Sequence, residues 1–120
     1  LDALETVNAR AAFKVPDANR RAVRLAQDWS LPGVGGSDAH DAAEVGNACT
    51  ALEAEELTVS ALREALAAGR CAAVLRKNTS HLRKGLSQWT AARRRGGVGR
   101  LLKGAAYILY CLWLDIIRRL

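Results

Sequence analysis

The residues best suited to chemistry stand together in the stretch GGSDAHD, residues 35–41. Asp38 and His40 are two positions apart, so on an extended strand end both side chains can point the same way. A carboxylate oxygen and an imidazole nitrogen together suit Zn, Mn or Fe. Two ligands do not close a site, because tetrahedral zinc takes three or four. The only other histidine, His81, lies far along the chain, so further ligands would have to come from upstream.

Other chemistries fit this stretch less well. A nucleotide-binding loop needs a lysine after its glycines, and the dinucleotide fingerprint needs a third glycine where this chain has Asp38. A triad of Ser37, Asp38 and His40 fails because triad side chains converge from separate elements. The remaining alternative is a polar turn, in which Asp38 caps and His40 hydrogen-bonds locally. Short motifs give many false matches, so spacing alone favours the turn over the metal site.

The surrounding pattern predicts three short strands. They cover residues 1–8, ending near Asn8, then residues 31–36 and residues 47–52. Strand, helix and strand in about 35 residues is typical of a parallel sheet or barrel, whose sites gather at the carboxyl ends of the strands. Asn8 and residues 35–41 would both lie at such ends.

Two helices separate these strands. The first is capped by Asp17 and ends by Ser30, because Pro32 disfavours helical geometry before it. The second is capped by Thr58 and stopped by Gly69. The residues expected to face inward are Ala18, Ala22, Leu25, Ala26 and Trp29 in the first helix, and Val59, Leu62, Ala65 and Leu66 in the second.

Charge divides the chain after Leu75. Residues 1–75 hold 7 Lys+Arg and 11 Asp+Glu, whereas residues 76–120 hold 11 Lys+Arg and only Asp115. The basic part shows an apolar stripe at Leu82, Leu86 and Trp89, a glycine-rich hinge over residues 93–99, and a final amphipathic helix. The apolar face of that last helix is predicted to hold Leu101, Leu102, Ala105, Leu109, Leu112, Trp113, Ile116 and Leu120, opposite Arg100, Lys103, Asp115 and Arg118. It could bind an anionic membrane, contact nucleic-acid phosphates, or pack on the preceding domain.

Composition gives expectations for the cellular location and for the redox state of the cysteines. Three cysteines without CxxC spacing, and the lack of a secretory signal, favour reduced thiols and a cytoplasmic location. The longest charge-free run covers only residues 104–114, so no transmembrane helix is expected. Because the chain opens on Leu1 in what reads as a strand, we expect a fragment of a longer protein.

Three segments carry a family resemblance. The stretches LDALETVNAR, NRRAVRLAQDWSLPGVGGSDAHDAAEVGNACT and LREALAAGR, within residues 1–71, resemble the C-terminal part of a polymerase and histidinol phosphatase (PHP) domain phosphoesterase. Asp38-x-His40 matches the last metal-binding motif of that family. The resemblance implies a seven-stranded βα barrel that holds two or three Zn, Mn or Fe ions and hydrolyses phosphate esters, including nucleic-acid ends and small nucleotides.

The resemblance also implies roles for individual residues. Asp38 and His40 would be metal ligands, and Asp38 would also steer the attacking water. Asn8 and Arg10, at the neighbouring strand end, would contact the substrate phosphate, the alternative being an asparagine turn followed by a surface arginine. Glu5 is interpreted as structural. The family's opening HxH motif, its middle acidic and histidine ligands and its later histidine-proline element are missing, so this chain alone should be inactive.

The sequence therefore predicts an α/β fold, with the C-terminal fragment of a PHP-type barrel over residues 1–75 and a basic amphipathic helical extension over residues 76–120. The predicted function is that of a metal-dependent phosphoesterase fragment. One alternative is a non-catalytic module whose basic tail binds nucleic acid, or a membrane through residues 100–120. Another is a truncated product with open strand edges.

Overall fold

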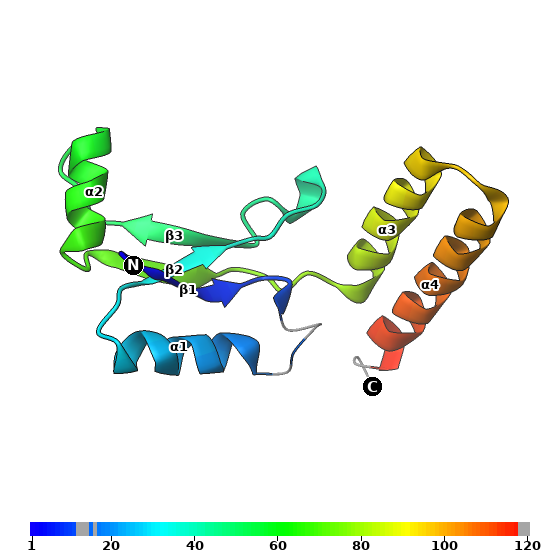
Figure 1. Ribbon diagram of the computed structural model, residues 1–120, viewed down its shortest axis with the longest axis horizontal. Helices are drawn as coiled ribbons and strands as arrows, with labels where there is room; N and C mark the ends of the chain where they lie inside the picture. The colour runs from blue at the N-terminus through cyan, green and yellow to red at the C-terminus, as the bar shows by residue number, and fades with distance from the viewer. Residues whose placement is uncertain (12–14, 16, 118–120) are drawn as a thin grey trace. The chain divides into compact units, whose positions relative to one another are not determined.

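The computed structural model describes residues 1–11, 15 and 17–117, which form a mixed α/β chain (Figure 1). The chain divides into two compact units, residues 1–78 and residues 79–120. The described strands form two sheets of two strands each. The predicted mixture of strands and helices is confirmed, while the seven-stranded barrel stays a prediction.

The first sheet of unit 1 is a parallel pair joined through a helix. Strand β1 (Leu4–Asn8) and strand β2 (Gly33–Gly36) flank helix α1 (Ala18–Asp28). Asn8 lies opposite Gly36 in the register. The two strand ends therefore share one edge of the sheet, as the βα pattern predicted.

The second sheet is antiparallel, which corrects the expectation of a parallel arrangement throughout. Strand β3 (Ala48–Leu52) pairs with strand β4 (Cys71–Leu75), and helix α2 (Val59–Ala67) lies between them in sequence. The nitrogen of Glu53, just after β3, donates to the carbonyl of Arg70, just before β4, at 3.0 Å. The segment that contains α2 therefore begins and ends at the same end of the strand pair. Strand β4, which the sequence pattern did not reveal, then runs back along β3.

The two sheets meet at Gly35. The hydroxyl of Thr50 accepts a hydrogen bond from the Gly35 nitrogen at 2.9 Å and donates one to the Gly35 carbonyl at 3.1 Å. A Cβ atom at Gly35 would lie 2.5 Å from the carbonyl oxygen of Cys49, much closer than van der Waals contact. Only glycine allows the two backbones to approach this closely.

The buried apolar residues of unit 1 are all small. Among the described residues they are Ala9, Ala26, Ala48 and Ala65. Three bulkier residues predicted to face inward are exposed instead, namely Leu25 (40%), Trp29 (61%) and Val59 (67%). Helix α1 buries only Ala26, and helix α2 only Ala65, so larger side chains on both helices face solvent.

The two predicted helix caps have different outcomes. The hydroxyl of Thr58 accepts a hydrogen bond from the Ala61 nitrogen at 3.2 Å, as expected of a capping residue. Asp17 precedes α1 in a left-handed conformation, with φ at 66°, and its side chain makes no capping bond. Its carboxylate instead lies 2.6 Å from the guanidinium of Arg20. The prediction that the Asp17 side chain caps α1 is therefore wrong.

Unit 2 is a helical hairpin of α3 (His81–Arg95) and α4 (Val98–Ile117), which run side by side in opposite directions (Figure 1). The break between them falls within the predicted hinge. The helices approach closely where glycines face the partner helix. A Cβ atom at Gly85 would lie 3.3 Å from the Ile108 Cα, and one at Gly104 would lie 2.9 Å from the Trp89 ring.

The apolar face of α4 points mostly away from α3. Its exposed members are Leu102, Leu109, Leu112, Trp113 and Ile116, all at least 40% accessible. Two residues of the predicted pattern, Arg118 and Leu120, lie outside the described residues. Within the described part of the chain, no helix combines the length and apolar character needed to cross a membrane.

Candidate functional site

The candidate site lies in the loop that follows β2. Residues 37–41 connect this strand to the short 3-10 helix η2 (Ala42–Glu44). The pairing of Asn8 with Gly36 places the end of β1 beside the start of the loop. Asn8 and the loop thus meet at the carboxyl end of the parallel pair, where functional groups of βα folds gather.

The ring of His40 is held by the backbone of Asp38. The His40 Nδ1 atom lies 2.8 Å from the Asp38 carbonyl oxygen. A carbonyl oxygen can only accept, so Nδ1 carries the proton and, in the neutral ring, Nε2 offers its lone pair. Nε2 makes no hydrogen bond to the described residues, and 49% of the His40 side chain is exposed. This is the arrangement in which a metal-binding histidine is held.

The carboxylate of Asp38 is also accessible to a metal ion. Its carboxylate is 3.7 Å from His40 Nδ1, and 36% of its side chain is exposed. Its backbone is left-handed, with φ at 50°, a conformation that aspartate adopts more readily than most residues. Asp38 therefore does not lie on an extended strand end as predicted, although both predicted ligands are exposed on one loop.

The polar-turn alternative is half right. His40 does hydrogen-bond locally, through Nδ1. The cap, however, is Asp41, whose Oδ1 accepts a hydrogen bond from the Ala43 nitrogen at 2.8 Å. The capping residue is therefore Asp41 and not Asp38.

The loop is anchored by a buried residue that the sequence reasoning missed. Glu44 is fully buried, and its Oε2 accepts a hydrogen bond from the His40 nitrogen at 2.6 Å. The same oxygen lies 3.5 Å from Nη1 of Arg10. The other oxygen, Oε1, is buried without a hydrogen-bond partner among the described residues. A sequence signal existed, since Glu44 is flanked by Ala43 and Val45 and an acid in apolar surroundings needs a partner.

Asn8 and Arg10 shape the neighbouring turn. The Asn8 Oδ1 accepts hydrogen bonds from the nitrogens of Arg10 at 2.9 Å and Ala11 at 2.8 Å. Its amide group donates to Glu5 at 3.3 Å, which fits the structural interpretation of Glu5. Arg10 is only 5% exposed, so the alternative of a surface arginine is wrong. Substrate binding by Asn8 and Arg10 stays a prediction.

The donors present suit a metal in type but not in number. Among the described residues, no group of three or more His, Cys, Asp or Glu side chains could hold a metal ion. Asp38 and His40 offer an oxygen and a nitrogen, which fit Zn, Mn or Fe. Closed sites need at least three protein ligands, so this part of the chain supplies at most one corner of a metal centre.

A comparison with protein families bears on this loop. Residues 16–71 match the family model described as PHP-associated. This segment is similar to that family. The match is consistent with the C-terminal part of a PHP domain protein, so the resemblance seen in the sequence is confirmed. Comparison with curated proteins and with solved structures gave no match.

The PHP-associated segment contains most of the candidate site. It includes α1, β2, the loop with Asp38 and His40, η2 with Glu44, β3 and α2. It excludes residues 1–15, and with them β1, Asn8 and Arg10, and it also excludes the helical hairpin. The buried pair of Arg10 and Glu44 thus joins the PHP-associated segment to the strand that precedes it.

Proposed function

We propose that this chain is the C-terminal portion of a PHP-type phosphoesterase in which Asp38 and His40 supply two of the metal ligands. The observation that carries the proposal is the His40 ring inside a PHP-associated segment. The ring is fixed through Nδ1, and its Nε2 makes no hydrogen bond to the described residues. The substrates would be phosphate esters, such as a nucleotide, a nucleic-acid end or a small phosphorylated metabolite.

Two features of unit 1 support a place in a larger barrel. The β1 and β2 pair is parallel with a helical crossover, which is the repeating unit of a βα barrel. The buried apolar residues are alanines, while larger ones such as Leu25 and Val59 are exposed. A barrel completed by further strands would cover part of this surface.

Each residue of the site would have a distinct task in the complete protein. Metal ions bound there would polarise the phosphoryl oxygen and lower the pKa of a bound water. His40 would present Nε2, and Asp38 would present its carboxylate and orient the water. Glu44 and Arg10, both buried, would fix the loop that carries these two ligands.

The test uses the protein with its upstream PHP portion. Asp38→Ala and His40→Ala are compared with Asp28→Ala, which removes a carboxylate at the end of α1. Metal content after dialysis is measured by mass spectrometry, and phosphatase activity with a generic aryl phosphate. We expect both site variants to lose bound metal and activity while the control keeps both. Normal metal content and activity in both site variants would contradict the proposal.

The α4 surface favours a second candidate function, attachment to a membrane by a non-catalytic module. The exposed apolar residues of α4 lie on the same helix as Arg100 and Lys103, and an apolar face with basic neighbours suits an anionic membrane surface. The contact would run through residues 100–120, of which the last three lie outside the described residues.

A further inference from the structure

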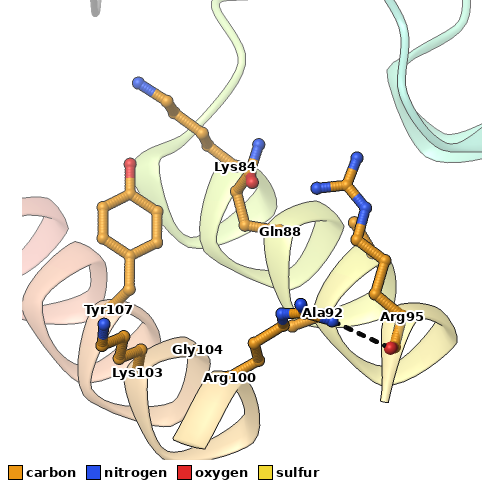
Figure 2. A pocket seen from close by; sticks show the side chains of 9 residues that line it. Lys84, Gln88, Ala92, Arg95, Arg100, Lys103, Gly104 and Tyr107 are labelled. Atoms are coloured by element: carbon orange, nitrogen blue, oxygen red, sulfur yellow. Dashed lines mark hydrogen bonds between the residues drawn. The ribbon is translucent and has the colours of Figure 1, made fainter. Parts of the chain in front are cut away.

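The helical hairpin contains a cavity of about 430 Å³ between α3 and α4 (Figure 2). All of its walls come from residues 79–120, so it belongs to unit 2 alone. The residues that line it are Lys84, Gln88, Ala91, Ala92 and Arg95 from α3, and Arg100, Lys103, Gly104 and Tyr107 from α4. Its volume lies within the range of about 300–1,000 Å³ that is usual for small-molecule sites.

Helical spacing explains why these side chains meet. The α3 members recur at i, i+4, i+7, i+8 and i+11, and the α4 members at i, i+3, i+4 and i+7, so each set forms one stripe of its helix. Ala91, Ala92 and Gly104 have little or no side chain, which leaves space between the stripes. In Figure 2, Lys84 and Arg95 of α3 and Tyr107 of α4 extend in the same direction.

The charge around the cavity is of one sign. Among the described residues, its lining contains four cationic residues and no carboxylate. The only acidic residue of the hairpin, Asp115, accepts hydrogen bonds from His81 and Leu82 at the start of α3. Cations grouped around a space without a carboxylate repel one another and attract anions.

One of these cations is held in place. Arg100 Nη1 donates to the Arg95 carbonyl at 3.0 Å and to the Gly96 carbonyl at 3.4 Å, and Figure 2 draws the first bond. A guanidinium fixed in this way has lost part of its side-chain freedom before any ligand binds. Less conformational entropy is then lost on binding.

We propose that this cavity binds a compact soluble ligand with two or more phosphate groups, such as a nucleoside triphosphate. Phosphate oxygens would accept charge-assisted hydrogen bonds from Arg95, Arg100, Lys103 and Lys84. The Tyr107 ring offers a surface on which a base can stack. The site is independent of the Asp38 and His40 loop, so either proposal can fail without the other.

The test is calorimetric titration of the chain with ATP and, separately, with inorganic triphosphate. Arg95→Gln and Lys103→Gln are compared with Arg93→Gln and Arg94→Gln, which remove the same charge from exposed positions of α3 that do not line the cavity. We expect each cavity variant to weaken binding roughly tenfold, as for loss of a charge-assisted hydrogen bond. The control variants should weaken it by no more than about twofold, in line with an exposed charge.

Three results would overturn the proposal. The first is no binding of either ligand to the unaltered chain. The second is an equal loss in cavity and control variants, which would mean diffuse attraction to a basic hairpin. The third comes from co-sedimentation with vesicles that contain phosphoinositide. If the chain bound these vesicles and neither soluble ligand, the phosphates recognised would be those of a lipid headgroup. Circular dichroism of each variant verifies that the helices remain.

Discussion

The guanidinium of Arg10 and the carboxylate of Glu44 lie 3.5 Å apart in the interior of unit 1, where they are 5% and 0% exposed. The same carboxylate accepts the backbone hydrogen bond of His40. One buried ion pair therefore connects the turn after β1 with the loop that carries both predicted metal ligands. The position of this loop depends on a contact between distant parts of the sequence.

Breaking this pair from one side should destabilise unit 1. Glu44→Gln keeps the shape of the side chain but removes the carboxylate that lies beside the buried Arg10 charge, which costs about 3–5 kcal/mol. Urea unfolding of the variant, compared with the unaltered chain, measures the loss. The double variant Arg10→Met with Glu44→Leu should recover most of it, because paired apolar replacements avoid the buried charge. Equal losses in the single and double variants would show that the pair is not the cause.

Asp115 should make the hairpin sensitive to acid. Burial raises the pKa of this carboxyl group, but the hydrogen bonds from Leu82 and His81 outweigh it and hold the pKa below the ordinary value of 3.8. The folded state therefore binds the proton less well than the unfolded state. The stabilisation from the carboxylate is complete above about pH 4 and is lost as the pH falls through the lowered pKa.

Asp115→Ala tests this interpretation. Asp115 accepts hydrogen bonds from the first two nitrogens of α3, at His81 and Leu82, so its loss resembles the loss of a helix cap and should cost about 1–2 kcal/mol near pH 7. Unfolding monitored by circular dichroism at pH 7 and at pH 2.5 gives the comparison. The difference in the free energy of unfolding between the variant and the unaltered chain should be smaller at pH 2.5 than at pH 7. A difference independent of pH would argue against a role for the charge.

The α4 face should bind anionic membranes. Trp113 is 55% exposed among other apolar side chains of α4, and burying an aromatic residue in a membrane interface is favourable by about 1.5–3 kcal/mol. Trp113→Ala should therefore weaken co-sedimentation with phosphatidylserine vesicles by about tenfold or more. Trp29→Ala is the matched control, because Trp29 is 61% exposed but lies in unit 1. Salt should weaken the binding, and equal binding to neutral vesicles would remove the electrostatic part of the hypothesis.

Local patterns predicted most of the elements. Strands ending at Asn8 and at Gly36, the Thr58 cap and two helices separated by a hinge within residues 93–99 are all present. Each depends on residues close together in sequence, whose periodicity and turn chemistry act within a few positions. The Asp17 cap failed because the backbone there is left-handed and Arg20 binds the carboxylate.

Sequence by itself determined the residue types of the candidate site and their spacing. Asp38 and His40 could be named as an oxygen and a nitrogen donor, and their stretch could be matched to the PHP family, from one segment of the chain. The polar face of the last helix, with Arg100 and Lys103, could also be read from helical spacing, because position on a helix follows from residue number alone.

Tertiary structure decided which groups face one another. Only the fold pairs β3 with β4 in antiparallel order, places Arg10 beside Glu44, and brings the α3 and α4 stripes around one cavity. It also shows that the apolar face of α4 points mostly away from α3. The close contact between the two helices is made at Gly85 and Gly104 instead. These contacts join residues far apart in the chain, and their energies depend on burial and distance, which periodicity does not contain.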